Sequence, residues 1–227
     1  MESMKSGEQP RIDAVANSES AVMNGGPATS SVPPPRIDLD AVSELVATGA
    51  RVLDLGCGDG DLLRLLVDRK QVIARGVEIS EDGVRQCVAK GLAVEHGDLD
   101  EGLNHYPDCS FDYVILSQTL QTVHRPELVL REMLRVGRVG IVSFPNFGYW
   151  RIRWQLLANG RMPKSDYLPY EWFDTPNIHL LTVSDFHHFC AENAISIRRA
   201  AYLTDGRRVS LHPNLFGKIA IFEIRQA

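Results

Sequence analysis

The stretch Val52–Asp61, VLDLGCGDGD, decides the fold, because it places three glycines within five positions directly behind an apolar run. These glycines are Gly56, Gly58 and Gly60. Residues 51–55 before them predict a buried strand, and the leucine-rich residues 61–70 after them predict a helix with an apolar face. Glycine lacks a Cβ, so it can adopt positive φ angles and lets a ligand approach the backbone. The stretch therefore predicts a strand, a tight turn that faces a ligand, and a helix.

The rest of the chain alternates between short β-type segments and helical segments. The predicted strands are 51–55, 72–79, 92–96, 111–116, 138–144, 195–203 and 218–224, and the predicted helices are 61–70, 80–90, 125–136 and 183–193. Strands separated by helices at this spacing favour βαβ units, so we expect an α/β fold with a mostly parallel sheet. Only a turn-like segment separates the last two strands, which is compatible with an antiparallel pair.

The first 35 residues differ in composition from the rest of the chain. They contain no Phe, Trp or Tyr, are rich in Ser, Gly, Ala and Pro, and end in Pro33-Pro34-Pro35. A segment of this composition buries too little apolar surface to offset the entropy lost on ordering. We therefore expect residues 1–35 to be a disordered N-terminal tail and residues 36–227 to form a single domain.

Composition excludes several classes of protein. The net charge of −5 gives no overall attraction to nucleic acid or to anionic membranes. No apolar run reaches the roughly 18–20 residues of a spanning helix, and the first residues lack the apolar stretch of a signal peptide. The four cysteines show no CxxC pairing, so we expect neither a metal site nor a disulfide framework. These features predict a soluble, cytoplasmic protein with reduced thiols.

Acidic residues accompany the glycine turn at successive strand ends. Asp54 precedes the glycines, Glu78 ends the second strand in GVEIS, and Asp98 follows the third strand in EHGDLD. Each acid alone is compatible with a solvated loop charge. The carboxyl ends of parallel strands share one edge of a sheet, where ligands bind. A carboxylate there can accept from both hydroxyls of a ribose, and another from an adenine amino group. Together these residues predict a nucleoside-binding site.

This combination of motifs resembles the class I S-adenosylmethionine-dependent methyltransferases. The resemblance implies a Rossmann-like fold with a seven-stranded, mostly parallel sheet whose last strand is antiparallel. It implies that Asp54 and the Gly56–Gly60 loop hold the methionine part of S-adenosylmethionine or S-adenosylhomocysteine, Glu78 the ribose and Asp98 the adenine. The cofactor-binding residues implied in this way are Asp54, Gly56, Cys57, Gly58, Gly60, Glu78, Ile79, Asp98, Leu99 and Ser117. The usual LKPGG element before the fifth strand is shortened here to Val136-Gly137-Arg138.

Residues 145–178 form an insertion that is too long for a simple connection between a strand and a helix. Nine aromatic residues, including all three tryptophans, lie between Phe144 and Phe173. The insertion is compatible with a small subsidiary core, with a lid over the cofactor, or with a protein-docking surface in which Arg151 and Arg153 interleave with tryptophans. Stacking on nucleic acid bases is disfavoured by the acidic chain.

The stretches VSFPNFGYWRIR and WFDTPNIHLLTVSDF, together with the glycine motif, GVEIS and SQTLQTV, resemble the MetW family of methionine biosynthesis proteins. The resemblance implies association with homoserine O-acetyltransferase, which members of the family are understood to support or activate. Methyl transfer by the family itself is not established. Two functions therefore stay open, namely a cofactor-binding accessory protein and a methyltransferase that acts on a small molecule. Nucleic-acid methylation has little support from the charge.

No catalytic residue is assigned from the sequence. A protic methyl acceptor can require a base, and the candidates are His124, His179, Tyr149 and Tyr170. His124 precedes a helix and His179 lies between two apolar residues, so a surface role and a partly buried structural role, respectively, also fit them. Cys57 lies inside the glycine loop, where we expect it to be a small packing residue.

Overall fold

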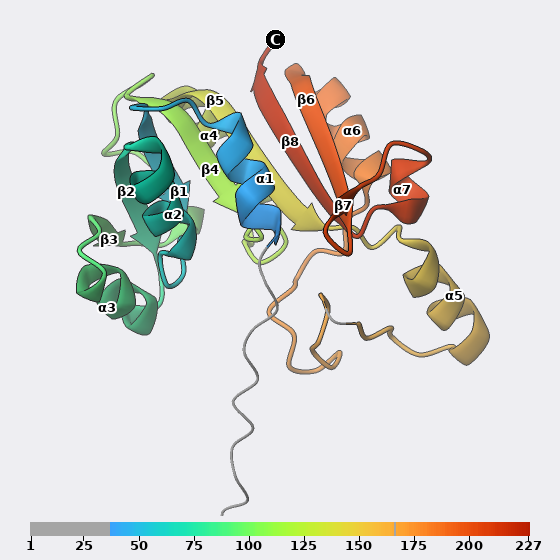
Figure 1. Cartoon of the computed structure of the whole chain (residues 1–227). Helices are drawn as coiled ribbons and strands as arrows, with labels where there is room; N and C mark the ends of the chain where they lie inside the picture. Colours follow the sequence, from blue (N-terminus) through green and yellow to red (C-terminus); the bar gives the residue numbers. More distant parts are fainter. Residues whose placement is uncertain (1–36, 166) are drawn as a thin grey trace, which may run out of the picture. The chain divides into compact units, whose positions relative to one another are not determined.

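An eight-stranded sheet with helices on both faces forms the centre of the protein (Figure 1). The computed structural model describes residues 37–165 and 167–227, so the predicted tail 1–35 lies outside the described residues. The strands are β1 (Arg51–Leu55), β2 (Ile73–Glu78), β3 (Val94–His96), β4 (Phe111–Ser117), β5 (Gly137–Pro145), β6 (Ile195–Thr204), β7 (Arg207–Arg208) and β8 (Ile219–Gln226). The helices are α1 (Ile37–Leu45), α2 (Asp61–Lys70), α3 (Glu81–Ala89), α4 (Pro126–Val136), α5 (Trp150–Asn159), α6 (Val183–Glu192) and α7 (Pro213–Phe216), with a 3-10 turn at η1 (Leu99–Glu101).

The strand order is β3-β2-β1-β4-β5-β8-β6-β7. Strands β1 to β5 are parallel to one another, whereas β8 is antiparallel to both β5 and β6. This confirms the predicted α/β fold, the mostly parallel sheet and the antiparallel last strand. The sheet has eight strands instead of the expected seven, because the two-residue β7 turns back on the end of β6. Asp205 and Gly206 join them with positive φ angles of 47° and 76°, the backbone that a tight hairpin requires.

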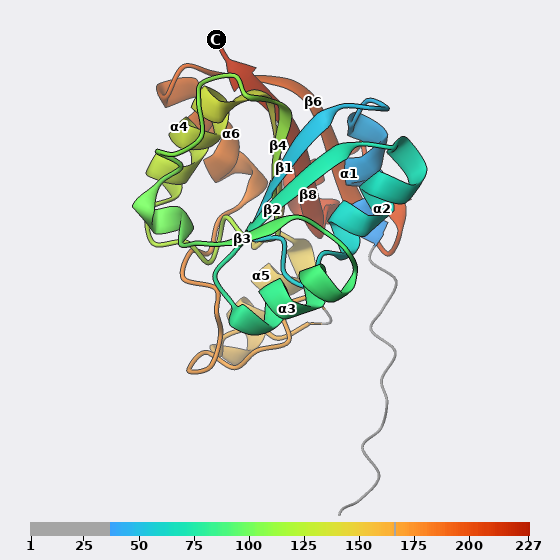
Figure 2. The same ribbon diagram turned by 90° about the vertical axis from the view of Figure 1, so that its left-hand side faces the viewer.

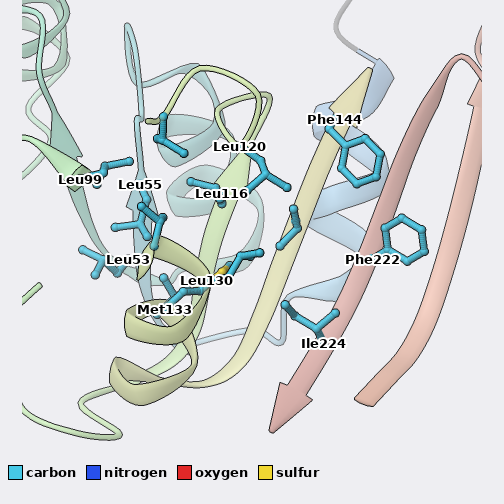
Figure 3. Packing of buried hydrophobic residues seen from close by; sticks show 14 of the residues in the cluster. Leu53, Leu55, Leu99, Leu116, Leu120, Leu130, Met133, Phe144, Phe222 and Ile224 are labelled. Carbon is cyan, nitrogen blue, oxygen red and sulfur yellow. The ribbon is translucent and has the colours of Figure 1, made fainter. Parts of the chain in front are cut away.

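Strands in the middle of the sheet are apolar on both sides, because helices cover both faces. On one face Leu53 and Leu116 pack towards Leu130 and Met133 of α4 (Figure 3). On the other face Val52 belongs to the core under α1 and α2. Successive residues of β1 therefore alternate between two cores, as the period of a strand requires.

Gly137 allows the direct connection between α4 and β5. Helix α4 ends at Val136, and β5 begins at Gly137 without an intervening loop. A Cβ on Gly137 would lie 2.5 Å from Val114 Cγ2 and 3.1 Å from the carbonyl oxygen of Met133. The close approach of α4 to β4 thus requires glycine here, and it accounts for the departure from the usual LKPGG element.

Among the described residues, no helix combines the length and the apolar character that crossing a bilayer demands. The longest helix, α4, has 11 residues, about half of the roughly 20 residues that span the hydrocarbon core.

Candidate functional site

The carboxyl ends of β1 to β4 meet at one edge of the sheet, with α3 beside them (Figure 2). The loop after β1 is fixed to β2, since Gly56 N donates to the carbonyl oxygen of Val77 at 2.8 Å. The end of β2 is fixed to β3 in the same way, by Gly97 N donating to the carbonyl oxygen of Glu78 at 3.0 Å. The structure therefore brings the glycine loop and the predicted residues of β2, β3 and β4 to one edge.

The three loop glycines all have positive φ, at 70° for Gly56, 57° for Gly58 and 82° for Gly60. A Cβ on Gly56 would lie 2.6 Å from Thr119 Cγ2, and a Cβ on Gly60 would lie 2.6 Å from Leu92 Cδ1. Gly58 differs, because its Cβ would have no atom within 4 Å. The first and third glycines therefore allow close packing within the protein, whereas the second borders open space.

Glu78 clamps this loop to the start of α3. Its side chain is buried, with 8% of the residue exposed. Oε2 accepts a hydrogen bond from Gly58 N, and Oε1 accepts one from Ser80 N, both at 2.8 Å. Gly83 lies against the same carboxylate, since a Cβ there would be 2.8 Å from Glu78 Cγ. Each carboxylate oxygen has a further lone pair for a ligand hydroxyl.

The other predicted residues are placed in different ways around this clamp. Asp54 is 2% exposed on β1, whereas Asp98 is half-buried and caps η1 by accepting from Asp100 N at 2.8 Å. Ile79 is exposed, Leu99 is buried in the core, and Ser117 Oγ lies 3.0 Å from Ser143 Oγ. The acids and Ile79 thus border the edge, while Leu99 contributes packing.

Cys57 is a packing residue of the loop. Its Sγ is 3.8 Å from Cys87 Sγ, and a Cβ on Gly76 of β2 would come within 2.5 Å of it. Burial raises the pKa of the Cys57 thiol, and the nearby Asp54 carboxylate raises it further. Burial likewise raises the pKa of Cys190 to about 11. Neither thiol is therefore activated as a nucleophile.

These environments predict the thiol reactivity of the native protein. Of the four cysteines, Cys57, Cys87 and Cys190 are buried and Cys109 is exposed. Because the thiolate is the reactive form, titration with Ellman's reagent at pH 8 is expected to modify one thiol per chain rapidly and three only on unfolding. A Cys109→Ser variant is the control and should lose the rapid phase. A rapid phase that persists in this variant would contradict the packing role of Cys57.

Sequence reasoning missed several residues that shape the site. Lys90 of the α3 end reaches back to the loop, where its Nζ donates to the carbonyl oxygen of Asp59 at 2.7 Å and to Asp61 Oδ1 at 2.6 Å. Thr119 packs on Gly56, and Gln118 before it has a positive φ of 56°. These contacts join segments that are far apart in the sequence. The only local signals near them are the stretch SQTLQ, which contains Gln118 and Thr119, and Gly83 in the first turn of α3.

The candidate bases do not converge on one point. His124 is exposed, and its backbone N–H donates to Asp100 Oδ2 at 2.9 Å. His179 Nε2 is buried and lines an apolar cavity of about 350 Å³ between α4 and α6. Tyr149 is buried in a small core, whereas Tyr170 is exposed. In the part of the chain that the structure describes, no group of three or more His, Cys, Asp or Glu side chains could hold a metal.

The insertion holds a small core and an exposed aromatic surface. Tyr149, Ile152 and Leu168 are buried together, separately from the main cores. Trp172 and Phe173 are 73% and 70% exposed and stack edge to face, with ring centroids 5.6 Å apart. They share one depression with Met162 and with the exposed side of α5. We call Met162, Trp172 and Phe173 the aromatic patch.

The donor and acceptor groups at the strand edge fit a nucleoside cofactor. Asp54 and Glu78 supply buried carboxylates, the start of α2 supplies backbone N–H groups, and Gly58 leaves open space beside them. Carboxylates accept from sugar hydroxyls or an amino group, and free N–H groups at a helix start donate to a carboxylate. Ile79 offers an exposed apolar side chain next to the clamp.

The chain is similar to known proteins over most of its length. The family model described as "Methionine biosynthesis protein MetW" matches residues 36–224. The bifunctional methionine biosynthesis protein MetXA/MetW of Rhodopirellula baltica is 34% identical over 198 residues, which cover 82% of this chain and 32% of that protein. The matches span about one third of the length of the first curated relatives.

Solved structures agree with the fold. An S-adenosylmethionine-dependent methyltransferase from Mesorhizobium loti is similar with a TM-score of 0.63 and 22% identity, over 84% of this chain and 98% of that chain. The [4+2]-cyclase SpnF is similar with a TM-score of 0.59 and 16% identity, over 83% of this chain and 80% of that chain. At these identities the likeness shows the fold alone, and a cyclase among the matches illustrates that one fold hosts different reactions.

Proposed function

The chain belongs to the family of methionine biosynthesis protein MetW, and from that premise we propose that it is a cofactor-binding accessory protein of homoserine O-acetyltransferase. In this proposal the edge of β1 to β4 binds S-adenosylmethionine or S-adenosylhomocysteine. The aromatic patch contacts the acetyltransferase. The protein acts in the cytoplasm, where its four free thiols remain reduced.

The acidic residues and the glycine loop support the cofactor part of the proposal. Glu78 would accept hydrogen bonds from the ribose hydroxyls while it holds the loop and the start of α3. Asp98 would accept from the adenine amino group, and Asp54 with Gly56 to Gly60 would face the methionine part. S-adenosylmethionine supplies an electrophilic methyl group when bound, and the residues at this edge orient it.

One observation carries the accessory part of the proposal, namely the bifunctional relative whose name joins MetXA to MetW. In this proposal the MetXA part is the homoserine O-acetyltransferase. In that protein the region that matches this chain is only 32% of the polypeptide. Two parts in one chain are held at a high effective concentration, which favours a physical contact between them. A MetW-family chain and an acetyltransferase that are not fused would need a docking surface to stay together in place of the covalent link.

A binding experiment tests both parts of the proposal. Titration calorimetry with S-adenosylhomocysteine is expected to give one site per chain, and gel filtration with homoserine O-acetyltransferase of the same organism is expected to give a joint peak. Adenosine alone should bind more weakly, because it lacks the methionine part that the glycine loop would hold. The cofactor part is contradicted by the absence of binding heat, and the accessory part by two separate peaks.

The aromatic patch makes a separate prediction. Exposed aromatic clusters are typical of protein interfaces, where truncating a central aromatic residue costs about 2 kcal/mol, a loss of roughly 30-fold in affinity. We expect Trp172→Ala and Phe173→Ala to weaken the complex with the acetyltransferase by roughly 10- to 30-fold. The complex would be measured by surface plasmon resonance.

Phe216→Ala in α7 is the matched control, since Phe216 is also exposed and lies outside the aromatic patch. Its affinity for the acetyltransferase should equal that of the unchanged protein, and all three variants should bind S-adenosylhomocysteine equally. Equal affinity of Phe173→Ala and Phe216→Ala for the acetyltransferase would remove the aromatic patch from the interface.

Methyl transfer to a small molecule is the alternative function of the same site. It would follow if the protein bound S-adenosylmethionine, formed no complex with the acetyltransferase and released S-adenosylhomocysteine with an acceptor present. The dispersed positions of His124, His179, Tyr149 and Tyr170 do not favour a base-assisted reaction.

A further inference from the structure

A cavity of about 520 Å³ lies inside the insertion, beside the end of β5 and the start of β8. Its walls come from α5, from Lys164, Ser165 and Tyr167, and from Lys218, which directly precedes β8. Helix α5 stands beyond the edge of the sheet in Figure 1. The cavity does not share a lining residue with the glycine loop or with the ends of β1 to β4.

The walls of this cavity are held in place. Tyr149 at the start of α5 packs with Ile152 and Leu168 in the small core of the insertion. Ser165 and Leu168 exchange two backbone hydrogen bonds of 3.0 Å, which tie Ser165 to this small core. The cavity is therefore largely preformed, as small-molecule sites usually are.

Three cations line the cavity, and they differ in their partners among the described residues. Lys164 Nζ pairs with Glu171 Oε1 at 2.7 Å, and Lys218 pairs with Asp205. Arg151 forms no ion pair with any residue that the structure describes. Its guanidinium lies 5.7 Å from the ring centroid of Trp150. The described residues that line the cavity therefore include three cations and no acidic side chain.

Buried polar groups also line this cavity. Gln155 Oε1, Ser165 Oγ and Tyr167 Oη are buried and accept or donate no hydrogen bond among the described residues. The Tyr167 and Ser165 hydroxyls lie near each other, but no hydrogen bond of normal geometry joins them. Burial raises the pKa of the Tyr167 phenol, so this hydroxyl stays protonated and can donate. A buried polar group without a partner is destabilising, and hydrogen bonds to a bound ligand would offset this cost.

The lining also offers apolar surface for the body of a ligand. Trp150 and Trp154 face the cavity from successive turns of α5, and the ring of Tyr149 forms its floor together with Lys218. Lys218 Nζ already lies over the rings of Tyr149 and Tyr167, at 5.7 and 5.8 Å from their centroids. A cationic ligand would meet this ammonium group, so the charge of the lining selects an anion.

We propose that this cavity binds a small organic oxyanion, either a carboxylate or a phosphate monoester. The charged group faces Arg151 and the hydroxyls of Tyr167 and Ser165, and the apolar body lies against Trp150 and Trp154. An arginine fork beside hydroxyl donors matches the geometry of both oxyanions. This site shares no lining residue with the proposed cofactor site, whereas it shares Gln155 and Lys164 with the depression that holds the aromatic patch.

Calorimetry with benzoate, phenyl phosphate and the neutral analogue benzamide tests the proposal. Benzoate or phenyl phosphate is expected to bind at one site per chain, and the tighter of the two identifies the charged group. Arg151→Gln should weaken that binding by roughly 10-fold or more, because hydrogen bonds to a charged group are lost. Tyr167→Phe keeps the ring of the wall and should weaken binding several-fold.

The exposed Arg198 on β6 provides the matched control, since Arg198→Gln removes one cation elsewhere on the protein. Its affinity should equal that of the unchanged protein. Three results would each overturn the proposal, namely no binding of either anion, equal binding of benzamide, and equal affinities of Arg151→Gln and Arg198→Gln. Circular dichroism melting of each variant confirms that the comparison is made on folded protein.

Discussion

Replacing Gly60 with alanine is expected to lower the free energy of unfolding by about 2–5 kcal/mol. Gly60 has a φ of 82°, which costs a residue with a Cβ about 1–2 kcal/mol. The added Cβ would also lie 2.6 Å from Leu92 Cδ1 and 2.8 Å from Cys87 Sγ, both in buried residues. Overpacking of a filled core costs about 1–3 kcal/mol more. Urea unfolding followed by circular dichroism measures the difference.

Gly49→Ala separates the two causes of this loss. Gly49 has a similar φ of 72°, but its Cβ would meet nothing within 4 Å. This control should therefore lose only the backbone share, about 1–2 kcal/mol. If Gly60→Ala and Gly49→Ala lose the same free energy, the loop does not pack against α3 as described.

Glu78→Ala is expected to lower the affinity for S-adenosylhomocysteine by roughly 10- to 150-fold, since hydrogen bonds to a charged group contribute about 1.5–3 kcal/mol. The carboxylate holds both Gly58 N and Ser80 N at 2.8 Å. Its removal therefore takes away the acceptor for the ribose and also frees the loop from the start of α3. Titration calorimetry at constant pH measures the affinity.

Glu81→Ala is the matched control for Glu78. The substitution Glu81→Ala removes the same carboxylate three residues further on. The side chain of Glu81 is exposed, however, and pairs with Arg85 on the surface of α3. It should keep the affinity of the unchanged protein. Comparable affinities of Glu78→Ala and Glu81→Ala would remove Glu78 from the cofactor site, and thermal melting would show whether either variant is unfolded.

The sequence predicted the central elements of the fold closely, because their signals are local. Strand β1 and helix α2 begin and end at the predicted residues 51–55 and 61–70, since the glycine turn bounds both. Helix α3 lies within the predicted range 80–90, and Ser80 caps it with a side chain that accepts a hydrogen bond from Gly83 N. The last two long strands pair antiparallel. Each of these follows from a short apolar period or from a cap.

Other elements could not be predicted, for different physical reasons. Helix α5 buries only Ile152, so its sequence WRIRWQLLAN shows no apolar stripe by which to identify a helix. Strand β7 has only two residues, too few for an alternating pattern, and it forms because Asp205 and Gly206 turn the chain back on β6. The contact of Thr119 with Gly56 joins residues far apart in the chain. No pattern in a single sequence contains such a pairing.

Within the site, the sequence predicted which residues reach the edge of the sheet but not what each one does there. The clamp from Glu78 to Gly58 and Ser80 arises only when β1, β2 and α3 come together. Leu99 lies in the main core instead of at the surface of the edge. The cavity beside Arg151 likewise depends on the fold of the insertion, because α5 and Lys218 are far apart in the sequence.

The rate of acetyl transfer by homoserine O-acetyltransferase of the same organism tests the central claim most directly. It would be measured with and without this protein at matched concentrations, and with Trp172→Ala in its place. The account predicts a large rise in rate with the unchanged protein and a smaller rise with the variant at equal concentration. A rate that does not change on addition of the protein, with no joint peak in gel filtration, would contradict the accessory function.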